Sequence, residues 1–208
     1  NTYLSSLTNE YNPNNNTKKA LLNINDIISS TYNNNVLKNT SGSYSLLNNI
    51  YNYTDPILIQ SIHSISSKGI FVKEHLGIEG YTYLGEDIVN HCINDILCKG
   101  AIPITFMDYY GCHRLNNESL EHYINGISKA CIKTNCCITN GQTMEMKDIY
   151  NYNTVELIGC ITGIVDRKHI INGKQKIKDG DICIGLHGFC PSNDGYNLIR
   201  KLFIDKKH

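Results

Sequence analysis

This 208-residue chain has no excess of positive or negative charge, no long apolar run and no C-x-x-C pair of the kind that binds metals. Basic and acidic residues both number 19 and the formal net charge is +0, so nothing global favours binding to nucleic acid or an anionic membrane. No apolar run approaches the roughly 18 residues that a membrane-spanning helix requires, and the polar N-terminus lacks the features of a signal peptide. We therefore expect a cytoplasmic protein without nucleic-acid or membrane partners.

Cysteine is plentiful, with nine residues, but its spacing argues against two common roles. An odd count without framework spacing is not typical of a secreted disulfide scaffold. No C-x-x-C occurs, and the adjacent Cys136 and Cys137 are poorly placed to hold one zinc ion together. The sequence predicts reduced, mostly buried thiols. Those in or beside apolar runs are Cys92, Cys98, Cys131, Cys160 and Cys183.

The order of apolar segments predicts an α/β or α+β domain. Residues 1–50 are rich in Asn, so we expect a partly ordered segment with one helix over 18–32. Strands are expected at 57–62, 102–109, 136–139 and 154–165, and a helix at 118–134 that starts from Asn116 or Asn117. A further short strand at 178–184 and a last helix from about Gly195 complete the expected order.

The segment GEDIVNHCINDILCKGAIPITFMDYY, from Gly85 to Tyr110, carries the most functional information. Apolar residues recur at helical spacing over 88–97, and Gly100 ends this helix before a buried strand that leads to Asp108. Acids and amides on the other helix face suit a metal and phosphate site, although spacing alone favours a solvated face. These polar residues are Asp87, His91, Asn94 and Asp95.

The same segment resembles the signature of the aminoimidazole ribonucleotide synthetase (phosphoribosylformylglycinamidine cyclo-ligase) family, close to GxDLVAMCVNDLxxxGAxPLFFLDYY. Weaker similarity runs from about 51 to 201. The matching residues are Gly85, Asp87, Val89, Cys92, Asn94, Asp95, Gly100, Ala101, Pro103, Phe106, Asp108, Tyr109 and Tyr110.

This resemblance implies an α+β fold in which a mixed β-sheet has helices on one side. Residues 51–170 would form the N-terminal, ATP-binding-type domain, and residues 171–208 the start of a second domain that is mostly missing. In the family, two sheets pair in a homodimer to form a barrel. We therefore expect a homodimer.

The first loop of the family pattern is altered here. A loop of the form DGVGTK reads HSISSK, over 63–68: Lys68 is kept, His63 replaces the acid, and serines replace the glycines. Imidazole is a poor Mg²⁺ ligand, and a Cβ resists the positive φ that glycine allows. Considered without the family, the segment is a polar turn.

Two further loops are also altered. The family's GGETAEMP reads NGQTMEMK over 140–147, where Gln142 replaces a carboxylate while Thr143 and Glu145 remain. Near the domain junction, at 191–201, Ser192 replaces a histidine. A surface charge at Glu145 and a capped helix after Gly195 are the alternative interpretations.

The family's activity is ATP-dependent imidazole ring closure in purine biosynthesis, with ATP and Mg²⁺ as cofactors. The resemblance implies Lys68 and Asp95 as catalytic residues, and Asp95 with Asp87 as metal ligands. It assigns nucleotide contacts to Lys68, Asn94, Thr143 and Glu145.

Because the altered residues are those that phosphate and metal chemistry needs, the sequence predicts impaired catalysis. The alternative is a pseudoenzyme that serves as a dimerising scaffold or an assembly component. A third possibility is that His63, His91 and Asp95 converge on a transition metal, since histidine in place of aspartate shifts the preference toward softer ions.

Overall fold

Four strands form one mixed sheet, in the order β1-β4-β2-β3. The computed structural model describes residues 15–36, 52–65, 67–152, 154–188 and 191–203. Strand β1 (Pro56–Ser64) pairs antiparallel with β4 (Val155–Asp166), and β4 pairs antiparallel with β2 (Ile102–Cys112). Strand β3 (Cys137–Glu145) runs parallel to β2. The expected α+β class with a mixed sheet is confirmed.

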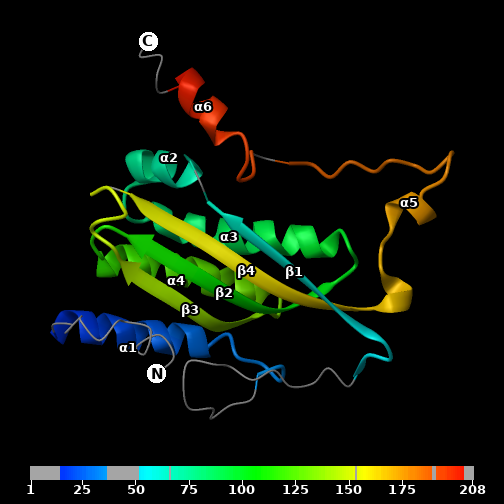
Figure 1. Ribbon diagram of the computed structural model, residues 1–208, viewed down its shortest axis with the longest axis horizontal. Helices are drawn as coiled ribbons and strands as arrows, with labels where there is room; N and C mark the ends of the chain where they lie inside the picture. Colours follow the sequence, from blue (N-terminus) through cyan, green and yellow to red (C-terminus); the bar gives the residue numbers. More distant parts are fainter. Residues whose placement is uncertain (1–14, 37–51, 66, 153, 189–190, 204–208) are drawn as a thin grey trace.

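Two long helices cover one face of this sheet (Figure 1). They are α3 (Gly80–Leu97) and α4 (Asn117–Lys133), and α4 provides the crossover that the parallel pair β2 and β3 requires. The side chain of Asn116 caps α4 by accepting a 2.9 Å hydrogen bond from the Ser119 amide, as the sequence predicted. Gly100, with φ +81°, follows the end of α3, which also agrees with the prediction.

The shorter helices lie around this layer. Helix α1 (Asn15–Ser29) packs on α4 and buries Ile24 and Ile28. Helix α2 (Ser67–Leu76) follows β1, and α6 (Tyr196–Phe203) lies against α2. A 3-10 turn, η3 (Arg167–His169), and the short α5 (Gly173–Lys176) follow β4. Predictions for residues 1–14 and 37–51 concern segments outside the described residues.

The core lies between the sheet and the pair α3 and α4. The apolar stripe of α3 is buried there as its spacing predicts, with Ile88, Val89 and Cys92 all at 0% exposure. Helices α3 and α4 cross at two glycines, Gly85 and Gly126, and the backbones approach so closely that no side chain would fit. A Cβ on Gly126 would lie 1.9 Å from the Thr82 carbonyl oxygen. A Cβ on Gly85 would lie 2.2 Å from the Tyr123 carbonyl oxygen.

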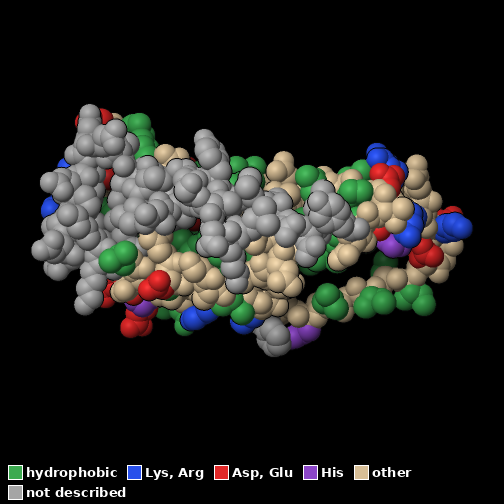
Figure 2. All heavy atoms as spheres, turned by 90° about the horizontal axis from the view of Figure 1, so that it is seen from below, with side chains coloured by type: hydrophobic (Ala, Val, Ile, Leu, Met, Phe, Trp, Pro, Cys, Tyr) green, Lys and Arg blue, Asp and Glu red, His purple; other side chains and the backbone are tan. Residues whose placement is uncertain are grey.

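Three sequence predictions need correction. The segment 178–184 forms no strand, and its apolar side chains are exposed; those of residues 177–188 stand out in green at the surface of Figure 2. A short apolar run after a turn does not form a strand unless a partner strand is available for its hydrogen bonds. The polar turn after β1 is shorter than expected, since Lys68 already belongs to α2. Cys98 and Cys183 are exposed rather than buried.

The other face of the sheet carries exposed apolar side chains. Leu58 and Ile62 on β1 are 58% and 66% exposed, and Ile102 at the start of β2 is also exposed. The register places Leu58 opposite Ile164 and Ile62 opposite Cys160, so these side chains share one face. Among the described residues, no helix is long and apolar enough to cross a membrane.

Candidate functional site

The polar face of α3 carries the chemistry of this domain. Asp87, His91 and Asp95 follow one another at intervals of four residues, so they lie along one side of the helix. The two carboxylates have different partners: Asp95 contacts His63 on β1, and Asp87 contacts Lys68 at the start of α2. Asp87 and Asp95 are eight residues apart, which corresponds to about 12 Å along the helix axis, so they cannot hold one ion between them.

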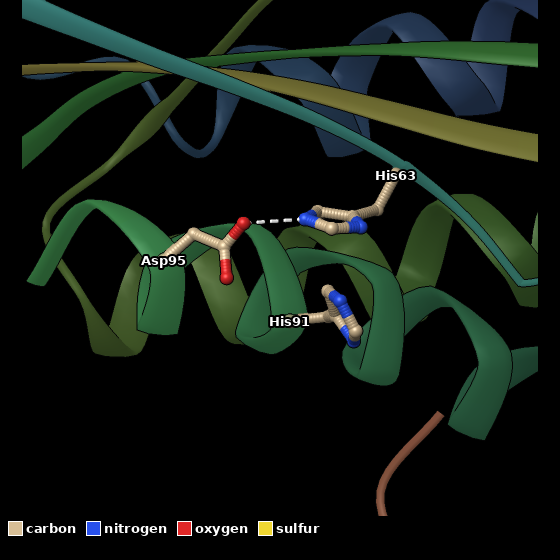
Figure 3. A group of neighbouring side chains, drawn as sticks. All are labelled: His63, His91 and Asp95. Atoms are coloured by element: carbon tan, nitrogen blue, oxygen red, sulfur yellow. Dashed lines mark hydrogen bonds and ion pairs between the residues drawn. The ribbon is translucent and has the colours of Figure 1, made fainter. Parts of the chain in front are cut away.

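Asp95 forms a cluster with two histidines (Figure 3). Its Oδ2 lies 2.5 Å from His63 Nε2 on β1 and accepts a 2.8 Å hydrogen bond from the Ser61 hydroxyl. The ring of His63 lies against that of His91, with centroids 3.9 Å apart and an interplanar angle of 60°. The hydrogen bond to His63, followed by that to Ser61, lowers the pKa of Asp95, so this carboxyl is ionised at neutral pH.

Lys68 is buried in an ion pair with Asp87. Its Nζ lies 2.6 Å from Asp87 Oδ2, donates a 3.3 Å hydrogen bond to the Ser192 carbonyl, and sits 5.2 Å from the centre of the Tyr196 ring. The Asn193 side chain donates to the Asp87 backbone carbonyl at 3.3 Å. The first loop, the signature helix and the junction segment therefore meet at one point, and the ammonium of Lys68 is already neutralised.

The family's second loop, expected at 140–147, is mostly strand here: Gln142, Thr143 and Glu145 belong to β3 and lie away from Lys68 and Asp95. Thr143 pairs in register with Tyr110 and is buried, and its hydroxyl has no hydrogen-bond partner among the described residues. Glu145 accepts a 2.9 Å hydrogen bond from the Leu115 amide and pairs with Lys147 at 3.2 Å. Gln142 is exposed and donates to Met144 Sδ at 3.2 Å. Glu145 thus stabilises the turn after β2 through its hydrogen bond with the Leu115 amide.

A cavity of about 520 Å³ lies next to this turn. Its wall includes the Tyr81 and Tyr110 rings, the basic side chains of Lys73 and Arg114, and the start of α4. Leu115, whose amide Glu145 holds, also lines it. Glu145 and Thr143 do not line the cavity themselves, but they neighbour two of its lining residues, Leu115 and Tyr110.

The structure brings together only some of the predicted site residues. Lys68 meets Asp87, and Asp95 meets His63, whereas Asn94 is exposed and Thr143 and Glu145 lie near the cavity. Asn193 and Ser61 were missed. Ser61 is two residues before His63, so strand alternation places both on one face and could have indicated it. Nothing local in the sequence indicates Asn193.

The donor set at Asp95 does not suit Mg²⁺. This ion prefers six oxygen ligands in octahedral geometry, but the cluster offers one carboxylate and two imidazoles. Asp87, the other predicted ligand, is occupied by Lys68. Gln142 is also on the wrong side of the sheet to join this cluster. His63 and Asp108 both pair with Gly159, and Asp108 pairs with Gly141, so these residues share one face. Gln142 follows Gly141 and therefore lies on the face opposite His63.

Comparison with known proteins gives consistent matches. The chain is 36% identical over 179 residues to a phosphoribosylformylglycinamidine cyclo-ligase of Alkaliphilus oremlandii, covering 86% of this chain and 51% of the relative. A cyclo-ligase of Clostridium botulinum is 36% identical over 177 residues, covering 85% and 52%. The chain thus spans about half the length of these relatives.

The fold comparison agrees with this. A solved structure of the hydrogenase maturation protein HypE in complex with ATP superposes with a TM-score of 0.55 at 17% identity, covering 83% of this chain and 46% of that one. Residues 55–165 match the family described as AIR synthase related protein, N-terminal domain. These residues include β1, β2 and β3, all of β4 except Asp166, and the whole of α2, α3 and α4. The chain belongs to this family and carries its N-terminal domain.

Proposed function

We propose that this protein is a divergent phosphoribosylformylglycinamidine cyclo-ligase-like protein whose nucleotide site is impaired. Family membership and the similarity to named cyclo-ligases support the reaction class. In this proposal residues 51–170 form the N-terminal domain, and residues 171–208 begin a second one. ATP is the expected nucleotide, as in the HypE complex. Mg²⁺ does not suit the Asp95 cluster, so we assign no step to it.

The observation that carries the proposal is the buried pair of Lys68 and Asp87. A lysine that is to bind phosphate must present an uncompensated ammonium, but here the counter-ion lies 2.6 Å away and the Ser192 carbonyl takes a further donor. Asp87 and Ser192 take two of the three ammonium donors of Lys68, and a phosphate that displaces Asp87 must offset a charge-assisted hydrogen bond of about 1.5–3 kcal/mol. We therefore propose that nucleotide binding is weak and that Lys68 contributes little to it, with Asn94, Thr143 and Glu145 as the remaining candidate contacts.

Isothermal titration of the chain with Mg-ATP tests this proposal. We expect wild-type binding no tighter than millimolar, little change in Lys68→Ala, and binding about tenfold tighter in Asp87→Asn, which frees the ammonium while keeping a side chain of the same shape. Glu86→Gln is the matched control. It removes one negative charge from the same helix, at a site 3.9 Å from Lys133 rather than Lys68, and should change nothing.

Micromolar Mg-ATP binding by the wild type, abolished by both Lys68→Ala and Asp95→Asn, would mean that the site is intact. Release of ADP in the presence of formylglycinamidine ribonucleotide would then identify the chain as an active cyclo-ligase.

A role as a dimerising scaffold is the second candidate, and the open face of the sheet favours it. Leu58 and Ile62 expose more than half of their surface on a face that no described helix covers, next to the half-buried Cys160. An apolar sheet face of this kind is stabilised when a second sheet packs on it. The proposed occupant is a second copy of this chain.

Light scattering on a sizing column tests the dimer. We expect the mass of two chains for the wild type and of one chain for Ile62→Lys, because a buried ammonium opposes sheet packing. Ile132→Lys, at an exposed apolar position on α4, is the control and should remain dimeric. A monomeric wild type would remove the scaffold candidate.

A further inference from the structure

Two imidazoles and a carboxylate come together outside any predicted nucleotide contact. His63 comes from β1, and His91 and Asp95 from successive turns of α3, so two elements of regular structure supply all three side chains. One ligand atom from each can be chosen so that all three lie within 4.8 Å of one another. Figure 3 shows Asp95 directed toward His63, with the His91 ring beneath it.

We propose that this cluster is a binding site for a divalent transition-metal ion of the Zn²⁺ and Co²⁺ class. Two imidazoles and one carboxylate are ligands that such ions prefer over Mg²⁺, which favours oxygen alone. The four-residue spacing of His91 and Asp95 places both on one helix face, the spacing that helical zinc sites use. Three protein side chains would bind the ion, which leaves its fourth coordination position for water.

The distances require only small side-chain movements. Bonds of about 2.1 Å place the ligand atoms of a tetrahedral site about 3.4 Å apart. The direct contact between His63 and Asp95, at 2.5 Å, must open to this spacing while His91 closes toward it. Asp95 is exposed and both histidines are half-buried, so the side chains can rotate and an ion can enter.

A neighbouring hydroxyl supports the arrangement. Ser61 donates to Asp95 Oδ2 at 2.8 Å and so holds the carboxylate toward β1, as outer-shell partners of metal ligands do. Cys92 does not join the site, because it is fully buried and its thiol lies 3.5 Å from the Gly159 carbonyl. The alternative to a metal site is a hydrogen-bonded pair of His63 and Asp95 with the His91 ring beside it. Metal titration distinguishes this pair from a metal site.

Titration of the metal-stripped chain with Co²⁺, under reducing conditions and without nucleotide, tests the site. We expect one equivalent to bind, with visible d–d bands but no thiolate charge-transfer band, because the ligands are nitrogen and oxygen. His91→Gln and His63→Asn should each weaken binding by about 100-fold, since losing an outer-shell partner alone costs about 10–100-fold. His169→Gln, an exposed histidine on η3, is the control and should bind as the wild type does.

A second readout guards against variants that fail to fold. Zn²⁺ should raise the melting temperature of the wild type and of His169→Gln but not of His91→Gln, while all three melt alike without metal. Absence of saturable Co²⁺ binding, a thiolate band, displacement by excess Mg²⁺, or binding unchanged in His91→Gln would each overturn the proposal. Because nucleotide is absent throughout, the result is independent of the proposed cyclo-ligase function.

Discussion

At the scale of single residues, the charged groups expected to bind ligands already have partners within the protein. Lys68 is held by Asp87 and by the Ser192 carbonyl, and Asp95 is held by His63 and Ser61. The sequence identified Lys68, Asp87 and Asp95 as candidates but could not show how they pair, because pairing depends on how β1 and α2 meet α3. The charged groups of the predicted site are therefore engaged in two separate pairs, Lys68 with Asp87 and His63 with Asp95.

Burial also changes the acidity of side chains in the core. Desolvation, and then the nearby Glu145 charge, raises the pKa of the Cys112 thiol to about 12. An unfolded cysteine ionises near pH 8.5. Between these values the native thiol keeps a proton that the unfolded chain has lost, so the free energy of unfolding falls as pH rises, by about 1.4 kcal/mol per pH unit from this group.

Chemical denaturation from pH 9 to 11 checks this prediction, with both pH limits lying inside the window of about 8.5 to 12. Cys112→Ala should show a shallower loss of stability with pH than the wild type. Cys98→Ala, which removes an exposed thiol, should follow the wild-type slope. Equal slopes in all three proteins would mean that Cys112 ionises normally.

At the scale of secondary-structure elements, the crossing of α3 and α4 depends on Gly85 and Gly126. A Cβ on Gly126 would collide with the backbone oxygen of Thr82, and backbone cannot move without separating the helices. We therefore predict that Gly126→Ala destabilises the domain by about 3 kcal/mol, the upper part of the range for overpacking, despite the better helix propensity of alanine.

Gly69→Ala in α2 is the matched comparison. There the new Cβ would lie 3.4 Å from Ile65 Cγ2, so replacing this glycine in the first turn of α2 should stabilise the domain by about 0.5 kcal/mol. Urea unfolding of both variants measures the two effects. A Gly126→Ala variant as stable as the wild type would show that the helices do not pack closely at this point.

The sequence predicted the central elements well because their signals are local. The apolar stripe of α3, the Asn116 cap of α4 and the stop at Gly100 each depend on residues a few positions apart. Helix α2 was missed because its first residues continue a serine-rich turn. The strand expected at 178–184 did not form, because an apolar run follows a turn there but no described strand pairs with it.

At the scale of the whole molecule, the chain is a family N-terminal domain followed by a segment that returns to it. Asn193 and Tyr196 contact the pair formed by Lys68 and Asp87, so the segment after β4 reaches back over the signature helix. The sequence indicated the family from one contiguous stretch. It could not place the site, because the residues that meet there lie up to 124 positions apart, as Lys68 and Ser192 do.

We propose that this chain keeps the family fold while its nucleotide and metal site has changed. A crystal structure of the chain grown with both Zn²⁺ and Mg-ATP, with anomalous diffraction at the zinc edge, tests it most directly. We expect a zinc peak between His63, His91 and Asp95, with Lys68 still paired to Asp87 and free of nucleotide. Phosphate bound to Lys68, with Mg²⁺ on Asp95 and no zinc peak, would contradict it.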